Sequence, residues 1–376
     1  MKITLVGPVY PYRGGIAHFT CMLAQKLIEA GHDVQMISFK KQYPLWLYPG
    51  KSDKDYSEGR EKIDAAYLLA PLNPLSWKRA VDAICKFKPE KVIFPWWVTI
   101  WGPAFHHIVT RLKKNDIPST ILIHNTLPHE AKPYDSFLAR WALQEADNFI
   151  VMTQKEKFRL LELLPHIIQA GNNLEVVPHP IYRVFKPTGT EKNKLRSKFG
   201  LPAEQPLMLF FGFVRPYKGL DDLLEAHKIL ISKGYQIKLI VAGEFWESIK
   251  KYEQKIHALE LTDFVKIIND YIPDDEAAQY FEMSDIFIAP YKGGTQSGVL
   301  KAALGFGLPV VLTDVIIDEV TDHFPSLCKI VPSQNPLMLA NGIEEQLNTP
   351  ALSNAEIEVV FSKTWEKMVK TISAQK

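Results

Sequence analysis

Cysteine is scarce in this sequence, and its few positions exclude two common ways of stabilising a fold. Only Cys21, Cys85 and Cys328 occur among 376 residues, far apart and without CxxC spacing. An odd, dispersed set neither frames a disulfide-stapled domain nor supplies the paired thiolates of a structural zinc site. The pattern is typical of a reducing compartment, so we expect a cytoplasmic protein.

Long apolar runs are lacking as well. The first run, Ile3–Val6, stops at Gly7, whereas the apolar region of a signal peptide spans about 7–15 residues. No later stretch approaches the roughly 20 apolar residues that cross a bilayer. The first run is therefore interpreted as a buried strand. Transient peripheral contact with the inner face of a membrane stays open.

Neither sign of charge is in excess. Lys and Arg number 44 against 42 acidic residues, which gives a formal net charge of +2. Nucleic-acid binding is normally accompanied by a clustered basic excess, so no nucleic-acid partner is expected. The short run Arg111, Lys113 and Lys114 is more typical of a solvated helix face. A chain of 376 residues with 47% hydrophobic content favours two globular domains.

Short runs that are apolar at nearly every position recur along the chain, which is typical of parallel strands buried on both faces. Helical patterns such as Ala17–Ala30, Leu220–Lys233 and Asp275–Met283 lie between them. This alternation predicts doubly wound α/β sheets. The predicted strands are Ile3–Val6, Val34–Ser38, Lys91–Pro95, Ser119–His124, Asn148–Met152, Leu174–Val177, Leu207–Phe213, Lys238–Ala242, Val265–Ile268, Ile286–Ala289, Val310–Thr313 and Cys328–Val331.

The pattern restarts once, after a charged, proline-containing stretch over Val177–Phe199. We therefore predict Rossmann-like domains over residues 1–185 and 186–350. The remaining residues, 351–376, have helical spacing and are expected to pack back across the domains, with a plain core helix as the alternative. Open α/β sheets bind ligands beyond the C-terminal ends of their strands. A ligand site is therefore expected in the cleft between the two facing domains.

Two loops of the second half carry the strongest chemical signal. Arg215 and Lys218 follow the strand that begins at Leu207, and two cations at a strand end suit a diphosphate. Pro290–Lys301 combines glycines, hydroxyls and a helix start, the ingredients of an anion-binding nest. The first βα turn, Gly7–Gly15, is similar but is not GxGxxG, so it predicts dinucleotide binding only weakly.

These loops resemble the nucleotide-sugar domain of family 4 glycosyltransferases, which have the two-domain GT-B architecture. The resemblance includes FGFVRPYKGLDDLLEA, LIVAGE, IINDYIPDDEAAQYFEMSDIFIAPY and GTQSGVLKAALGFGLPVVLTD. It continues in the first half through GPVYPYRGGIAHFTCMLAQKLIEAGHDV, PWWVTIWGP, ILIHNTLPHE and ADNFIVMTQKEK. It spans nearly the whole chain, with the motifs in the family's order.

The resemblance implies a retaining transfer of a hexose from a nucleoside-diphosphate sugar, UDP or GDP, without a metal or other cofactor. The acceptor would be a glycan, a lipid-linked sugar or a small molecule, joined by an α-linkage. It implies catalytic roles for His124, Arg215 and Lys218, and acceptor contacts for Gly14, Trp97, His129 and Glu130. The implied donor-binding set is Gly15, Arg215, Lys218, Glu244, Tyr271, Thr295, Gln296, Ser297, Gly298 and Val299.

Three tryptophans of the PWWVTIWGP motif have two interpretations. Trp96, Trp97 and Trp101 either stack on a sugar face or pack in the core. His124 likewise is either a structural strand-end histidine or a neighbour of the donor sugar.

One departure from the family concerns the sugar and ribose contacts. Many members carry two glutamates separated by seven residues, and Gly294 and Ala302 hold those places here. The segment is similar to a TQSG branch of the family. Gln296, Lys301 and Glu244 are the candidates for replacing these contacts. A catalytically silent sugar- or nucleotide-binding subunit, or an epimerase or hydrolase on the same scaffold, are the alternative functions.

Overall fold

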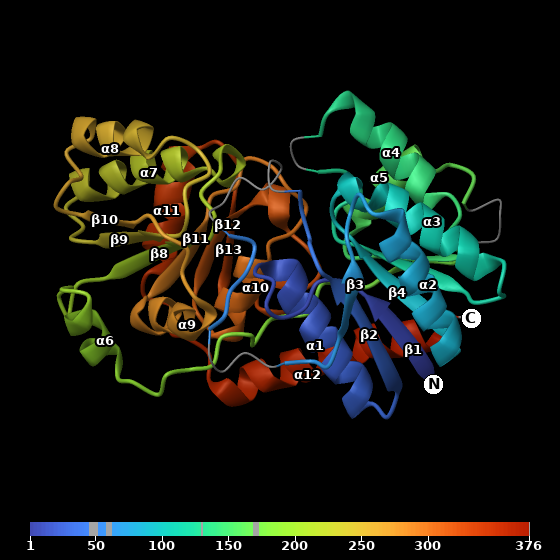
Figure 1. Cartoon of the computed structure of the whole chain (residues 1–376). Helices are drawn as coiled ribbons and strands as arrows, with labels where there is room; N and C mark the ends of the chain where they lie inside the picture. Colours follow the sequence, from blue (N-terminus) through green and yellow to red (C-terminus); the bar gives the residue numbers. More distant parts are fainter. Residues whose placement is uncertain (45–51, 58–61, 129–130, 168–172, 376) are drawn as a thin grey trace. The chain divides into compact units, whose positions relative to one another are not determined.

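The computed structural model describes residues 1–44, 52–57, 62–128, 131–167 and 173–375, which pack as two units (Figure 1). The first comprises the described residues up to His179, apart from Ser57, and the chain end from Lys363. The second comprises Ser57 and Pro180–Ser362. The packing boundary thus falls between His179 and Pro180.

The first unit is a seven-stranded parallel sheet with the strand order β3-β2-β1-β4-β5-β6-β7. Its strands are β1 (Lys2–Val6), β2 (Asp33–Phe39), β3 (Ala66–Leu69), β4 (Lys91–Trp96), β5 (Ser119–Ile123), β6 (Asn148–Val151) and β7 (Asn173–Val176). Its helices are α1 (Gly15–Glu29), α2 (Pro74–Phe87), η1 (Thr99–Trp101), α3 (Gly102–Lys113), α4 (Pro133–Leu143) and α5 (Gln154–Leu163).

Right-handed crossovers decide which face of this sheet each helix covers. The chain moves one way along the sheet through α2, α3, α4 and α5, which therefore share a face, and α3 packs against both α2 and α4. It moves the other way through α1, which covers the opposite face. The end of α12 (Asn354–Ala374) lies on that face too, because the Trp365 ring packs 5.6 Å from the Phe19 ring of α1.

The second unit repeats the plan with a six-stranded parallel sheet of order β10-β9-β8-β11-β12-β13. The strands are β8 (Leu207–Phe211), β9 (Lys238–Ala242), β10 (Val265–Ile268), β11 (Ile286–Ala289), β12 (Val310–Thr313) and β13 (Cys328–Val331). The helices are α6 (Lys192–Lys198), η2 (Pro216–Lys218), α7 (Leu220–Ser232), α8 (Ile249–Ala258), α9 (Asp274–Met283), α10 (Gly298–Gly305), η3 (Asp314–Ile316), η4 (Thr321–His323) and α11 (Pro336–Gln346).

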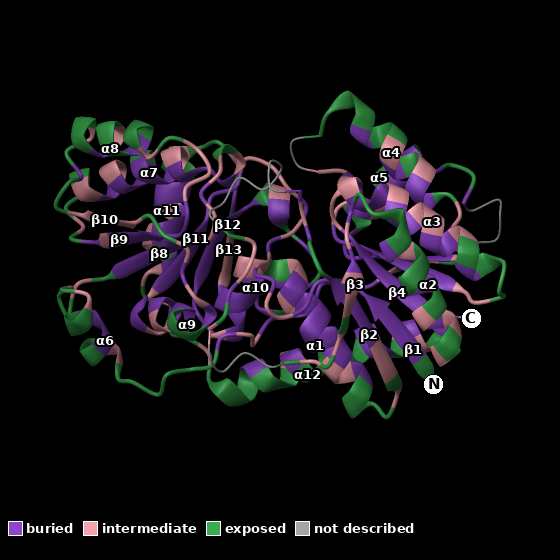
Figure 2. Cartoon of the chain, in the orientation of Figure 1, coloured by how far each residue is buried: buried purple, intermediate pink, exposed green. Residues whose placement is uncertain are grey.

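Both sheets are buried on their two faces, which confirms the doubly wound α/β prediction (Figure 2). All twelve predicted strands are present within a residue or two at each end. One strand, β3, was missed. It pairs with β2 alone at the sheet edge and only Leu69 of its four residues is buried, so the sequence lacks the continuous apolar run of an inner strand.

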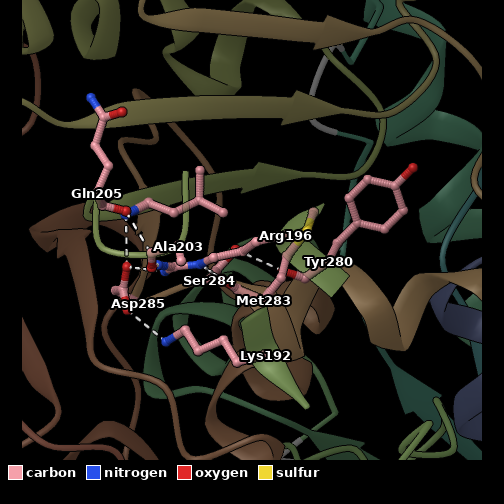
Figure 3. A network of polar contacts seen from close by, with 9 residues as sticks. Lys192, Arg196, Ala203, Gln205, Tyr280, Met283, Ser284 and Asp285 are labelled. Carbon is pink, nitrogen blue, oxygen red and sulfur yellow. Dashed lines mark hydrogen bonds and ion pairs between the residues drawn. The ribbon is translucent and has the colours of Figure 1, made fainter. Parts of the chain in front are cut away.

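A polar network fixes the start of the second unit to the N-terminal ends of β8 and β11 (Figure 3). The Arg196 guanidinium, on α6, forms an ion pair with Asp285 and donates from Nε to the Met283 carbonyl at 3.0 Å. Asp285 also accepts the Leu207 N–H at 2.7 Å and pairs with Lys192. Because Arg196 is buried, its charge needs these partners.

Helix α12 belongs to both units, since its residues pack with the second unit up to Ser362 and with the first from Lys363. Its end is held by Lys91, a buried side chain that donates to the carbonyls of Ile372, at 2.7 Å, and Gln375. A cation beside the final carbonyls of a helix is favourable for the helix dipole.

The three cysteines are free, as expected. No helix in the described ranges is both long and apolar enough to cross a membrane.

Candidate functional site

Apart from Gly15, which begins α1 in the first unit, the predicted donor residues lie at one edge of the second sheet. All six strands are parallel, so the loops that follow β8, β9, β10 and β11 leave from the same edge. The strand order reverses between β8 and β11, the position at which open α/β sheets leave a crevice for ligands. Arg215 and Lys218 follow β8, and Thr295–Val299 follow β11. Glu244 follows β9 and Tyr271 follows β10.

The loops after β8 and β11 touch through their backbones. A Cβ atom on Gly219, which has φ +73°, would lie 1.9 Å from the Pro290 carbonyl oxygen. Beside this contact the Lys292 N–H donates to the Tyr217 carbonyl at 2.7 Å. Only glycine combines this conformation with so close an approach. Gly219, the last residue of the RPYKG motif, therefore sets the distance between the two loops.

Lys218 is buried within this arrangement and faces the second loop. A Cβ atom on Gly212 would lie 3.2 Å from Lys218 Nζ and 3.3 Å from Val299 Cγ2, so the ammonium lies close to the first turn of α10. Only 6% of Lys218 is exposed. Its ammonium lies 5.7 Å from the Tyr291 ring centroid. Among the described residues, no carboxylate lies within ion-pair distance of it.

Burial, and secondarily the positive charge of Arg215, lower the pKa of Lys218 to about 7. Lys292, in the neighbouring loop, has the opposite environment. Its ammonium lies 2.7 Å from Asp221 and 3.0 Å from Asp222 at the start of α7, and these partners raise its pKa. One lysine of the pair is thus neutralised by carboxylates, whereas the buried one, when protonated, has no carboxylate partner among the described residues.

The second loop presents the N-terminus of α10. Ser297 is the N-cap: its Oγ accepts the Leu300 N–H at 3.2 Å and lies 3.0 Å from the Tyr291 hydroxyl. Its side chain therefore has a structural partner on each side. Thr295 is only 1% exposed, and its Oγ1 has no hydrogen-bond partner within the described part of the chain. With Gly298 and Val299 in the first turn, the helix start offers backbone N–H groups to an anion.

The two positions at which glutamates were expected are built differently. Gly294 has φ +124°, a conformation that side-chain-bearing residues rarely adopt, and Ala302 is buried inside α10. Lys301, one of the candidate replacements, cannot reach a sugar. Its ammonium is fully buried and binds both carboxylate oxygens of Asp318, so this candidate was wrong. Glu244 is buried and Gln296 half-buried in loops at the same sheet edge, and both stay predictions.

His124 occupies the corresponding edge of the first sheet, directly after β5. It is 2% exposed, and its backbone N–H donates to the Trp96 carbonyl at 2.8 Å. Its ring packs edge-on against Phe19, with centroids 4.8 Å apart, and 6.2 Å from His179. Burial and then the neighbouring His179 lower the pKa of His124 well below its usual value, so the imidazole is neutral at pH 7.

The remaining first-unit predictions separate into two groups. Trp96 and Trp101 are 1% and 0% exposed and pack in the core, so they cannot stack on a sugar. Trp97 is half-buried, and its Nε1 donates to the Tyr43 hydroxyl at 2.8 Å. Gly14, with φ +97°, and Gly15 begin α1, and a Cβ on either would meet nothing within 4 Å. His129 and Glu130 lie outside the described residues.

Two features of the site were missed from the sequence. The Arg215 guanidinium lies over two rings, those of Tyr217 and Trp246, and Trp246 belongs to the loop after β9. Tyr291 contacts both Lys218 and Ser297. Neither aromatic role has a sequence signal, because spacing along the chain does not show which rings meet which cations.

Among the described residues, no group of three or more His, Cys, Asp or Glu side chains is placed to hold a metal ion.

Two family models match the chain, one in each unit. Residues 13–182 match glycosyltransferase family 4, and residues 205–349 match glycosyl transferases group 1. An uncharacterized glycosyltransferase of Haemophilus influenzae is 24% identical over 351 residues, which cover 90% of this chain and 88% of that protein.

Solved structures with the same fold are more distant in sequence. HepE of Anabaena in complex with UDP-glucose superposes with a TM-score of 0.70 at 16% identity and covers 100% of both chains. Sucrose-phosphate synthase of Thermosynechococcus elongatus gives a TM-score of 0.68 at 16% identity, covering 99% of this chain and 98% of that one. These similarities confirm the GT-B fold.

The close contact between the loops predicts an unequal effect of two glycine substitutions. Gly219→Ala and Gly234→Ala both place a side chain at positive φ, which costs about 1–3 kcal/mol of unfolding free energy. At Gly234 a Cβ meets nothing within 4 Å, whereas at Gly219 it overlaps the Pro290 oxygen. We expect Gly219→Ala to cost about 1–3 kcal/mol more in urea denaturation. Equal losses would contradict the close approach.

Proposed function

Because each half of the chain matches a glycosyltransferase family model, we propose that it is a glycosyltransferase that transfers a hexose from a nucleoside-diphosphate sugar with retention of configuration. The acceptor is a glycan, a lipid-linked sugar or a small molecule, and the product has an α-linkage. UDP is the first donor nucleotide to test, since HepE of Anabaena was solved with UDP-glucose, and GDP is the second.

The observation that carries this proposal is the buried charge of Lys218. Burying an ammonium without a carboxylate is costly, and the cost is recovered when an anion enters the site. Lys218 lies beside the first turn of α10, where backbone N–H groups and the helix dipole also favour negative charge. We assign this cradle, with Arg215 and Thr295, to the donor diphosphate.

The same cations provide the electrostatic part of the catalysis. Negative charge grows on the β-phosphate as the bond from the sugar to the leaving nucleotide breaks. Fixed positive charges stabilise this state more than the ground state and so lower the barrier. In the proposed mechanism Arg215 and Lys218 take the place of a divalent cation, and the transfer is independent of metal.

Retention follows if the acceptor attacks the face from which the phosphate leaves. The acceptor hydroxyl forms the new bond to the anomeric carbon, the bond to the β-phosphate oxygen breaks, and that phosphate oxygen accepts the hydroxyl proton. This reaction needs no protein nucleophile. We assign the neutral His124 imidazole to a hydrogen bond with the sugar, Gly15 to the donor, and Gly14 and Trp97 to the acceptor.

Recognition of the sugar and ribose differs from that of the glutamate-bearing members. The conformation of Gly294 and the burial of Ala302 mean that substituting glutamates at these positions would strain the loop or overfill the core. We propose that Glu244, Gln296 and Tyr271 supply these contacts, with Ser297, Gly298 and Val299 holding the phosphates through the helix start.

Removing the charge of Lys218 should weaken nucleotide binding. Lys218→Met keeps most of the unbranched side chain and loses the ammonium, so we expect UDP to bind at least about tenfold more weakly in calorimetry. Lys228→Ala is the control, because Lys228 pairs with Glu260 on the surface. Unchanged UDP and GDP affinity in Lys218→Met would contradict the assignment.

The affinity should also depend on pH through this lysine. The pKa of Lys218 is about 7 without a ligand, and a bound diphosphate raises it, so binding is favoured by the protonated form. Below about pH 7 Lys218 is already protonated, so ligand binding takes up no proton there. Above it, the dissociation constant rises by up to about tenfold per pH unit. Lys218→Met should lack this rise, whereas the titration of the phosphate itself affects both proteins. Identical pH profiles would contradict the prediction.

Activity assays test the reaction itself. We expect nucleotide release from the cognate donor, an α-anomeric product signal by NMR, and an unchanged rate in EDTA. Activity abolished by EDTA and restored by Mn²⁺ would contradict the metal-independent mechanism. Tight binding of every donor without turnover would instead support a catalytically silent subunit.

A further inference from the structure

The two cations of the proposed diphosphate cradle contact aromatic faces. Lys218 Nζ lies 5.7 Å from the Tyr291 centroid, and Arg215 Cζ lies 5.4 Å from the Tyr217 centroid and 5.3 Å from that of Trp246. A ring face attracts a cation through its quadrupole without cancelling its charge. Rings can therefore hold a cation in place and leave its full charge for an anion.

Trp246 is itself firmly positioned. Past the ends of β8 and β9 the two segments continue side by side. The backbone N–H of Val214 donates to the Glu244 carbonyl, and the backbone N–H of Trp246 donates to the Val214 carbonyl, both at 3.0 Å. The Trp246 ring stacks on Phe213 at 4.4 Å with an interplanar angle of 30°. The ring that Arg215 contacts is thus fixed by the backbone and by a second ring.

Arg215 needs such support because it lies near a second positive charge. Arg215 is one of the two causes that lower the pKa of Lys218, so the two like charges repel. A flexible arginine would relieve that repulsion by turning toward solvent. Contact with the two rings resists this turn, and such contact does not itself use the N–H donors of the guanidinium.

We propose that Trp246 is a positioning residue for donor binding, acting through Arg215: its ring holds the guanidinium in the orientation that meets the diphosphate. Tyr217 supports the same guanidinium from the loop of Arg215 itself. This inference rests on the proposed diphosphate site and adds to it the loop after β9, which has no cation of its own at this position.

Inorganic pyrophosphate separates this role from direct contact with the nucleotide, because it has the diphosphate but neither base nor ribose. We expect Trp246→Ala to weaken pyrophosphate and UDP by the same factor, about three- to tenfold, in calorimetry. Trp246→Phe, which keeps a ring face, should restore most of the affinity. Trp77→Ala, which removes a half-buried ring of the first unit, is the control and should change neither affinity.

A double-mutant cycle tests the route through Arg215. In an Arg215→Ala background, Trp246→Ala should cause no further loss. Tyr217→Ala should behave in the same way, which keeps the test decisive if Trp246→Ala does not fold, as judged by its melting temperature. An additive loss in the cycle, or a loss for UDP but not for pyrophosphate, would overturn the positioning role.

Failure of the underlying site has a different signature. If Arg215→Ala left the affinities for both pyrophosphate and UDP unchanged, the diphosphate assignment itself would be wrong, whatever the effect of Trp246. If Arg215→Ala bound pyrophosphate and UDP more weakly but Trp246→Ala bound both with wild-type affinity, only the positioning role would be overturned.

Discussion

The cradle of the second unit depends on the contact between two backbones at the point where the strand order reverses. Gly219 at φ +73° lies against the Pro290 carbonyl, and the Lys292 N–H bonds to the Tyr217 carbonyl. Because β8 and β11 are parallel neighbours, their following loops start from the same edge. The backbone contact then fixes how far Lys218 lies from the first turn of α10, and the side chains build on that distance.

The second constraint is electrostatic. Two lysines lie in these loops, and their environments are opposite: Lys292 is neutralised by Asp221 and Asp222, whereas Lys218 is buried and faces a ring and a helix N-terminus. The carboxylates hold the loop together without cancelling the charge that an anion would meet. This division allows one short region to be both a stable junction and the proposed diphosphate site.

Departures from the family pattern are part of the packing and not isolated losses. Gly294 adopts a backbone conformation suited to glycine, and Lys301 pairs with Asp318 inside the unit, where breaking the pair would leave a buried charge at a cost of about 3–5 kcal/mol. The α10 loop is therefore a consistently built alternative, and the proposed sugar and ribose contacts come from Gln296 of this loop and from the loops after β9 and β10.

The sequence by itself determined the sheets, the strand-end loops and the resemblance to a glycosyltransferase family, because parallel strands buried on both faces are apolar at nearly every position and the loop motifs are contiguous. Among the strands that the structure describes, only β3, a half-exposed edge strand, was not predicted. Tertiary structure alone decided the role of each side chain: Ser297 caps α10, Trp96 and Trp101 enter the core, and Trp246 packs on Arg215. These outcomes depend on contacts between residues far apart in the chain, which local spacing cannot encode.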